Sequence, residues 1–431
     1  MLRSFRVANH RSIRAEQELL LMPAYDKTRP VVPVAALFGA NASGKSNLLD
    51  ALKFMQTAVR DSYADWKPGT GVPRRPFKLD PDAAAEPSVY VVDLLLDGVR
   101  HIYGFEVDDE KVREEWLYAF PHNRRRVIFD RTDQQIKLGS TLADHRARTT
   151  LLTELTRGNT LFLSAAAHAN VAEVLPLYEW FRTRMAVLDP SPRADRHTLV
   201  EGLMPGSPAR RAVLGLLRAA DLGITDVIVD PAHTELLALQ KDQSVLDLSP
   251  EDLLDKVRAL LDRQPAGSPL RFIHGAASAT LNLEEQSEGT RAWMAIIDCL
   301  LDVLADGRVM VVNEVDSSLH PRLTRHLVEM FKDPETNTRN AQLIIACQDA
   351  TLLGRDLDED ILPRDSVWFV EKDRRGATSL YPLSGFKPRK DENTERRYLA
   401  GLYGAVPELY DVEFSQAVRA YRKGAVERAA S

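Results

Sequence analysis

The sequence predicts an α/β protein with a mixed sheet, an antiparallel β meander and a helical insertion. Three observations predict this class. A glycine-rich loop at 39–46 lies between a β-rich run and a helical pattern, short β-rich segments follow residue 88, and an apolar strand ends in polar residues at 313–314. The long separation between Ser46 and the strand at 309 leaves room for the insertion.

The first elements are two strands followed by a strand, the glycine-rich loop and a helix. MLRSFRVANHRSI and EQELLLM alternate as strands, VVPVAALF is a buried strand, and residues 47–58 have helical spacing. Gly39 and Gly44 allow backbone N–H groups to turn inward toward an anion, and the helix N-terminus adds its positive dipole end. Lys45 then reaches the terminal phosphates of a nucleoside triphosphate, and the Ser46 hydroxyl coordinates Mg²⁺.

The next elements are a polar loop, the meander and a group of helices. Residues 65–87 are rich in Pro, Gly and Asp, and the β-rich runs after residue 88 are separated by turn signals. Helical patterns at 150–187, 208–220 and 250–263 alternate with the strand-like ITDVIVD and TELLALQ. We therefore predict a first lobe with the phosphate loop and the meander at 1–149, a mainly helical insertion at 150–275, and the second half of the core at 276–431.

The second half of the core contains buried strands that end in polar residues. SEGTRAWMAIIDCLLDVLA and LTRHLVEMF predict helices, whereas RVMVVNEVD and AQLIIACQD predict strands. Ligands of open α/β sheets gather at the carboxyl ends of such strands. Glu314 is the candidate that polarises the attacking water, and Asn313 stands where a metal-binding carboxylate is usual. Because an amide brings no negative charge, we expect weaker Mg²⁺ binding than with aspartate.

Two other groups of residues have both a structural and a functional interpretation. Ser287 and Gly289 open a helix, where the serine either caps the helix or helps to bind an anion. We favour the anion because this helix precedes the acidic strand. Asp316 and His320 follow that strand, and each either caps the next helix or contacts a second subunit.

The composition is that of an ordinary globular protein. A hydrophobic content of 44%, a charged content of 27% and a net charge of −6 exclude a uniformly basic surface. The run HNRRR at 122–126 is either a solvated hairpin tip or a phosphate contact. Cys299 and Cys347 lack metal-ligand spacing, and we expect buried thiols. Without a signal-peptide core or an apolar run of about 18 residues, we expect a cytoplasmic location.

Four motifs, in order, resemble those of ABC-type ATPase heads. GANASGKS resembles the Walker A motif, QSEGTR the signature, VVNEVDSSLHP the Walker B motif with the D-loop, and IIACQD the switch strand. The chain most resembles the AbiL/RloA-like AAA/ABC-type ATPases of bacterial phage-defence (abortive infection) loci, which are similar to the ATPase part of OLD nucleases. The resemblance extends from VANHRSIR to the tail that follows VWFVEKD.

The resemblance implies ATP and Mg²⁺ as cofactors. It implies nucleotide contacts from Gly39, Asn41, Gly44, Lys45, Ser46 and Asn47, metal binding by Ser46 and Asn313, hydrolysis by Glu314, and contacts from Ser287 and Gly289 to the nucleotide of a second chain. Gln348 stands in the place of the usual switch histidine, so it can donate a hydrogen bond but cannot carry a proton. We expect secure ATP binding and slow hydrolysis.

The resemblance also implies a homodimer that shares its ATP sites and regulates a separate effector, such as a TOPRIM/RloB-type nuclease. A DNA-repair or chromosome-associated ATPase is the first alternative, with nucleic acid as a partner and a basic groove as its mark. The ATPase subunit of a transporter is the second, although we expect no membrane contact. VWFVEKD at 367–373 faintly resembles the opening strand of a TOPRIM domain, but too few residues follow it. We therefore assign it as the last strand of the head.

Overall fold

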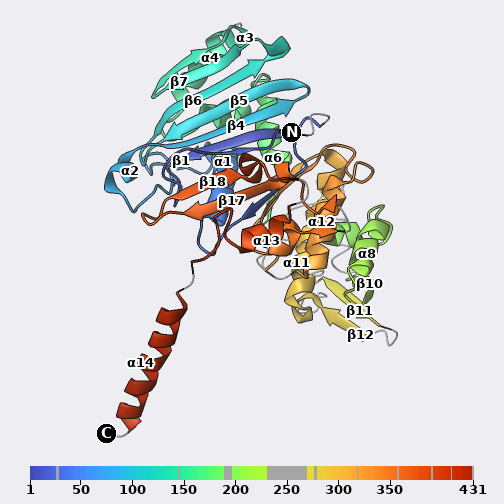
Figure 1. Cartoon of the computed structure of the whole chain (residues 1–431). Helices are drawn as coiled ribbons and strands as arrows, with labels where there is room; N and C mark the ends of the chain where they lie inside the picture. The colour runs from blue at the N-terminus through green and yellow to red at the C-terminus, as the bar shows by residue number, and fades with distance from the viewer. Residues whose placement is uncertain are drawn as a thin grey trace.

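The computed structural model describes residues 1–25, 29–143, 146–188, 197–230, 269–275, 279–317, 319–356, 359–389, 392–408 and 410–429. The described residues form a seven-stranded antiparallel sheet and a six-stranded, mostly parallel sheet, so the predicted mixed α/β class with a β meander is confirmed. Helix α1 (Lys45–Asp61) packs in one apolar cluster with both sheets. Figure 1 shows the antiparallel sheet above α1 and the other sheet below it.

The antiparallel sheet has the strand order β2-β1-β4-β5-β6-β7-β8. Its strands are β1 (Leu2–Ala8), β2 (Gln17–Leu20), β4 (Ser88–Leu96), β5 (Val99–Val107), β6 (Val112–Phe120), β7 (Arg126–Thr132) and β8 (Gln135–Leu138), and helix α2 (Pro81–Ala85) precedes β4. Residues 122–126 are exposed at the β6–β7 connection, in agreement with a hairpin tip. The Arg125 guanidinium lies over the Tyr118 ring, 3.9 Å from its centroid.

The mostly parallel sheet has the order β18-β17-β3-β14-β13-β9. Its strands are β3 (Val34–Phe38), β9 (Met185–Leu188), β13 (Val309–Val312), β14 (Gln342–Ala346), β17 (Val367–Lys372) and β18 (Thr378–Pro382), of which only β18 is antiparallel to its neighbour. The segment VWFVEKD thus belongs to the core sheet as β17. It is not the last strand, because β18 follows it.

Helices cover both faces of this sheet. The meander is followed by α3 (Ser140–Ala143), α4 (Arg146–Leu155), α5 (Phe162–His168) and α6 (Leu175–Thr183). Apolar residues of α5 and α6 join the cluster that contains α1. We predicted helices over 150–187, but the end of that stretch forms β9, because Met185 to Leu188 pair in parallel with β13 at the sheet edge.

The opposite face of the sheet is covered by a second apolar cluster. The elements on this side and beyond are α7 (His197–Leu203), α8 (Arg210–Ala219), β10 (Ile224–Val229), β11 (Leu270–His274), β12 (Ala279–Asn282), α11 (Glu288–Asp306), α12 (Pro321–Lys332), β15 (Arg355–Asp356), β16 (Glu359–Asp360), α13 (Thr394–Leu399) and α14 (Asp411–Ala429). The predicted strand TELLALQ and the helix at 250–263 lie outside the described residues. The division at 150 and 275 stays a prediction.

The two cysteines are both free thiols. Cys347 is fully buried, and Cys299 is half-buried. Burial raises the pKa of Cys347 well above its usual range and raises that of Cys299 to about 12. Neither thiol is therefore activated as a nucleophile.

Candidate nucleotide-binding site

The phosphate loop connects β3 to α1 in a conformation that requires its glycines. Gly44 immediately precedes α1 and has φ 113°, in the left-handed region. A Cβ atom at Gly44 would lie 2.2 Å from Thr378 Oγ1, and one at Gly39 would lie 2.2 Å from the Val370 carbonyl oxygen. Other residues would therefore displace the strands that support the loop.

Lys45 lies folded over this loop. Its side chain is buried, and Nζ donates to the carbonyl oxygens of Gly39 at 2.6 Å and Ala40 at 3.1 Å. Burial lowers the pKa of Lys45, whereas the carboxylates of Asp316 and Glu314 act in the opposite direction. This places the ammonium group at the phosphate loop, where the carboxylates and phosphates of a nucleotide site would be its natural partners.

Three side chains support the phosphate loop from behind through a chain of hydrogen bonds. Asn47 Nδ2 donates to Ser12 Oγ at 2.6 Å, and Ser12 Oγ lies 2.7 Å from Thr378 Oγ1. The Thr378 hydroxyl donates its hydrogen to the Ser43 carbonyl oxygen at 2.8 Å. The Ser12 hydroxyl must therefore donate to Thr378 Oγ1. We call Ser12, Asn47 and Thr378 the loop brace. We interpreted Asn47 as a nucleotide contact, and the structure gives its amide this bracing bond.

Sequence reasoning missed Ser12 and Thr378. Ser12 follows β1, and Thr378 is the first residue of β18. The only signal near Ser12 was its position within VANHRSIR, a stretch that the ABC-type resemblance already included. Thr378 has no local signal, because a threonine that starts a strand is ordinary.

The polar residues at the ends of β13 and β14 lie at the same sheet edge as the phosphate loop. Strands β3, β14 and β13 are parallel neighbours, so their carboxyl ends lie side by side. Asp316 Oδ2 accepts from the backbone N–H groups of Gln348 at 2.7 Å and Asp349 at 2.6 Å. Asp316 therefore connects the loop after β13 to the loop after β14. This role differs from both helix capping and contact with a second subunit, the two roles that the sequence suggested for Asp316.

The two predicted catalytic side chains, Glu314 and Gln348, are exposed at this edge. Glu314 has φ 52°, a left-handed conformation that glutamate adopts rarely. Such strained residues cluster at functional sites, where the surrounding structure holds them. The hydrogen bonds of Ser317 N and Oγ to the Glu314 carbonyl oxygen, at 3.1 and 2.9 Å, contribute to this restraint.

The structure places Asn313 and Ser46 on the walls of one small cavity. The cavity has a volume of about 100 Å³ and is lined by Ser46, Leu49, Asp50, Lys53, Val187, Leu188, Val311 and Asn313. Asn313 Oδ1 is buried and has no hydrogen-bond partner. No group of three or more His, Cys, Asp or Glu side chains in the described ranges forms a preformed metal site. The free oxygen fits Mg²⁺, which takes few protein ligands when nucleotide phosphates supply the others.

Ser287 is the N-cap of α11. Its Oγ accepts from the Thr290 backbone N–H at 3.1 Å, and its side chain is exposed. Among the described residues, no hydrogen bond or cavity joins Ser287 or Gly289 to the phosphate loop of the same chain. The capping interpretation holds for the isolated chain, and an exposed helix N-terminus remains available to a second chain. His320 caps α12 by accepting from Arg322 N at 3.2 Å.

A basic pocket adjoins the loop brace. Its volume is about 510 Å³, and its lining is Arg11, Ser12, Asn47, Arg74, Arg75, Pro76, Lys78, Leu79, Lys372 and Gly376. Lys78 and Lys372 are exposed, whereas Arg11 pairs with Asp50 at 2.5 Å. The pocket shares Ser12 and Asn47 with the brace, so it opens beside the start of α1 and has room for a nucleoside.

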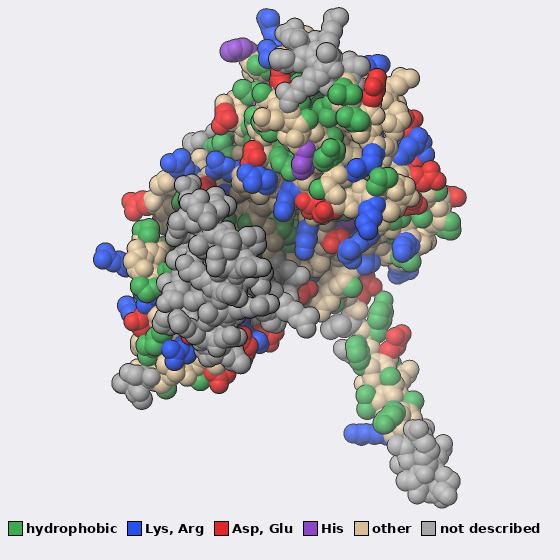
Figure 2. Space-filling view, turned by 180° about the vertical axis from the view of Figure 1, so that it is seen from behind, with side chains coloured by type: hydrophobic (Ala, Val, Ile, Leu, Met, Phe, Trp, Pro, Cys, Tyr) green, Lys and Arg blue, Asp and Glu red, His purple; other side chains and the backbone are tan. Residues whose placement is uncertain are grey.

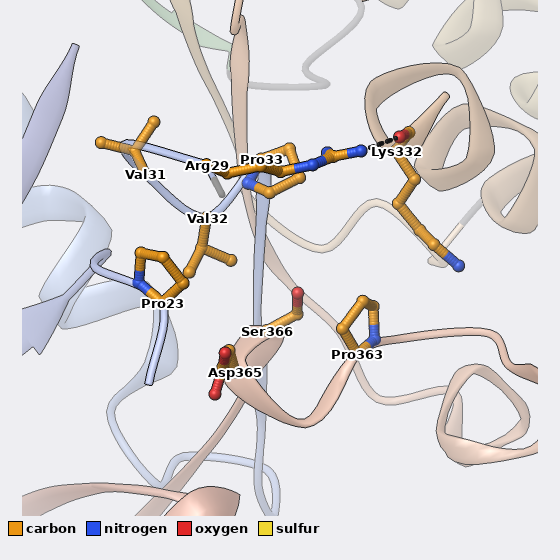
Figure 3. A pocket seen from close by; sticks show the side chains of 9 residues that line it. All are labelled: Pro23, Arg29, Val31, Val32, Pro33, Lys332, Pro363, Asp365 and Ser366. Atoms are coloured by element: carbon orange, nitrogen blue, oxygen red, sulfur yellow. Dashed lines mark hydrogen bonds between the residues drawn. The ribbon is translucent and has the colours of Figure 1, made fainter. Parts of the chain in front are cut away.

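Another cavity lies at the opposite edge of the sheet. It has a volume of about 160 Å³ and adjoins Pro33 and Ser366, which directly precede β3 and β17. Figure 3 shows its three prolines and two valines, with the Arg29 guanidinium donating to the Lys332 carbonyl oxygen at 3.0 Å. Because the phosphate loop follows the carboxyl end of β3, this cavity is separate from the predicted nucleotide site.

These features define the class of protein. A glycine-rich loop between a central parallel strand and a helix, with Lys45 over the loop and polar strand ends beside it, is the arrangement of a P-loop nucleotide-binding protein. A family model described as "AAA domain, putative AbiEii toxin, Type IV TA system" matches residues 34–354. This is well over half of the chain, and the chain belongs to this AAA family.

Among solved structures, the SMC head domain from Thermotoga maritima is similar to this chain at 12% sequence identity and a TM-score of 0.36, over 88% of this chain and 98% of that chain. No curated protein matches the sequence. None of the described helices is both long enough and apolar enough to span a bilayer.

Proposed function

We propose that this protein binds ATP and Mg²⁺, hydrolyses ATP slowly, and acts as a dimerising switch that regulates a separate effector in anti-phage defence. The observation that carries the proposal is the arrangement at one sheet edge. The buried Lys45 lies over the phosphate loop. Burial lowers its pKa, and the carboxylates of Asp316 and Glu314, which follow β13 at the same sheet edge, act in the opposite direction. Membership of an AAA family supports the nucleotide-binding part.

In this proposal the chain provides three parts of the ATP site. The loop amides and Lys45 hold the phosphates, and the basic pocket beside Ser12 and Asn47 accommodates the base and ribose. Ser46 and Asn313 would hold Mg²⁺, which neutralises charge on the β- and γ-phosphates when bound. Hydrolysis then depends on Glu314, whose exposed carboxylate accepts a proton from the attacking water.

The slow ATP hydrolysis in this proposal follows from two amide side chains, those of Asn313 and Gln348. Asn313 brings no charge to the metal, and Gln348 cannot transfer a proton. The Gln348 side chain can still donate a hydrogen bond to the γ-phosphate, and Asp316 holds its backbone N–H at this sheet edge. A slow enzyme of this kind remains in its ATP-bound state for longer, which suits a switch better than a motor.

The exposed start of α11 supports the shared-site part of the proposal. Ser287 and the first N–H groups of α11 form an anion site at a helix end, and this chain's own phosphate loop does not use it. In the dimer, Ser287 and Gly289 contact the γ-phosphate held by Lys45 of the other copy. ATP thus favours the closed dimer, and hydrolysis releases it.

Two observations support a defence role. The matching family model carries the name of a putative toxin from a type IV toxin–antitoxin system. The motif order also resembles that of phage-defence ATPases. The separate effector, such as a TOPRIM/RloB-type nuclease, remains part of the proposal because β17 belongs to the ATPase sheet rather than to a nuclease domain.

The first alternative, a DNA-repair or chromosome-associated ATPase, is favoured by one observation. The exposed Lys78 and Lys372 give the pocket beside the phosphate loop a basic rim that could take nucleic acid instead of the nucleoside. Fluorescence titration with a labelled mononucleotide and with a labelled DNA duplex distinguishes the two. Competition of ATP with DNA would favour the alternative.

A mixing experiment tests the shared ATP sites. Lys45→Ala removes the charge that faces the phosphates, and Ser287→Arg blocks the helix end that reaches the other chain. Each variant alone should lose nearly all ATPase activity. Mixed heterodimers retain one intact composite site, so activity should return to about a quarter of the wild-type rate if random pairing makes half of all dimers heterodimers and each site works alone.

The control mixes Lys45→Ala with Lys137→Ala, a change of an exposed side chain on strand β8, and measures ATPase activity under the same conditions. That mixture should retain the activity of its Lys137→Ala chains. If heterodimers of the two site variants are demonstrated by mass and still show no activity, independent shared sites are excluded. Full activity of Ser287→Arg alone would exclude the trans contact itself.

A further inference from the structure

The C-terminal helix α14 stands clear of the rest of the molecule. Figures 1 and 2 show it projecting from the body. Every described side chain from Val412 to Arg422 is exposed. Most helical stability in proteins comes from packing an apolar face rather than from helix propensity, so an unpacked helix such as α14 favours a partner surface.

Three large apolar side chains of α14 lie on one face. Phe414, Val418 and Tyr421 are spaced by four and three residues, and 65%, 56% and 73% of their surfaces are exposed. This spacing places them in one stripe, of the kind that two paired helices bury between them. Val412 and Gln416, one turn apart, lie on the other side of the helix.

The charges along the helix indicate what covers this stripe. Asp411 and Glu413 lie in its first turn, whereas Arg419 and Arg422 follow Val418. A second copy in antiparallel orientation places the acidic end of each helix beside the basic end of the other, and the two helix dipoles oppose. A parallel pair would instead align like charges. The charges of two copies of α14 are therefore complementary when the two helices are antiparallel.

We propose that α14 pairs with α14 of a second copy of this chain, antiparallel, through Phe414, Val418 and Tyr421. This contact needs no nucleotide and does not depend on the shared ATP sites proposed above. Two helices of this length bury less than the roughly 1,200 Å² of a stable interface, so a dissociation constant in the micromolar range is expected. The α14 pair would keep two ATPase bodies at high local concentration, which would favour their association when ATP binds.

Analytical ultracentrifugation of the full chain without nucleotide tests the pairing. The wild-type chain should form dimers at tens of micromolar, and Phe414→Ser with Val418→Ser should weaken dimerisation at least about tenfold. The matched control, Val412→Ser with Gln416→Ser, makes the same number of changes on the other face and should dimerise normally. ATP binding by each variant reports that the body remains folded.

Charge reversal tests the orientation at low salt. Asp411→Arg with Glu413→Arg should weaken the dimer, as should Arg419→Glu with Arg422→Glu, because each set removes most of the charge difference between the two ends of the helix. All four changes together give the two ends of the helix opposite charges again, so the dissociation constant of the dimer should return to within about threefold of wild type. Failure to recover would overturn the antiparallel arrangement. A wild-type chain that stays monomeric, or equal loss in the control face variant, would overturn pairing with a second copy and assign α14 to a different partner.

Discussion

Asn313 is the residue whose chemistry most affects the expected behaviour of the site. Its Oδ1 is buried without a hydrogen-bond partner, in a cavity that it shares with Ser46. An unpaired buried polar atom costs roughly 1 to 3 kcal/mol, so this oxygen is held available at a cost to stability. A bound metal ion, or a water molecule bound to it, would supply the missing partner of Asn313 Oδ1 and offset this cost.

Asn313→Asp should strengthen Mg²⁺ binding and raise the ATPase rate, because a carboxylate attracts the cation where the amide does not. We expect a gain of roughly tenfold in Mg²⁺ affinity measured at constant ATP, which corresponds to about 1.4 kcal/mol. Asn313→Leu is the matched control, since it keeps the size but removes the oxygen, and it should weaken Mg²⁺ binding. Equal affinity in all three proteins would show that residue 313 does not contact the metal or its water.

At the scale of elements, the phosphate loop depends on two segments that are far apart in sequence. Ser12 follows the first strand, and Thr378 opens the last one, yet both lie against Gly44 and Ser43. The brace fixes the loop carbonyl of Ser43 and thereby the direction of the neighbouring N–H groups. A preorganised anion site binds more tightly because less ordering is required on binding.

Thr378→Val should lower ATP affinity about fivefold, because it keeps the shape of the side chain while removing its bonds to Ser43 and Ser12. The loss of a buried hydrogen bond should also cost about 1 kcal/mol of unfolding free energy. Thr378→Ser retains the hydroxyl and serves as the control. Isothermal titration calorimetry and urea unfolding measure the two effects, and unchanged affinity in Thr378→Val would show that the brace is not needed for binding.

The sequence predicted the phosphate loop and the polar strand ends because each is a local pattern. Glycines between an apolar strand and a helix, and acids after an apolar strand, need no knowledge of distant residues. The brace could not be predicted, since its hydrogen bonds join residues 12, 47 and 378 only after the sheets assemble. The short strand β9 was missed because its pairing with β13, rather than its own pattern, makes it a strand.

At the scale of the molecule, two layers of sheet enclose α1, so the phosphate loop is held on a rigid body. The parts predicted to complete the ATP site, α11 and its Ser287, lie on the other side of the mostly parallel sheet. This geometry favours closure by association of two bodies rather than by a loop within one chain.

Glu314→Gln should bind ATP normally but remain in the closed dimer, because an amide cannot accept the proton of the attacking water. Size-exclusion chromatography with light scattering should show an ATP-dependent dimer that persists for at least about ten times longer than in the wild type. Adding Phe414→Ser and Val418→Ser to Glu314→Gln removes the proposed α14 contact and isolates the contribution of ATP. Rapid return of Glu314→Gln to its nucleotide-free state would exclude Glu314 as the hydrolytic residue.

The position of β3 has a consequence for biosynthesis. β3 pairs with β14 and β17, and both of these strands are made near the end of translation. At translation rates of roughly 5 to 20 residues per second, β14, the first strand that pairs with β3, is synthesised on the order of tens of seconds after the apolar segment VAALF. A nascent or truncated chain therefore carries two unpaired strand edges and no supported ATP site. Prematurely terminated products would therefore be prone to aggregate through these edges.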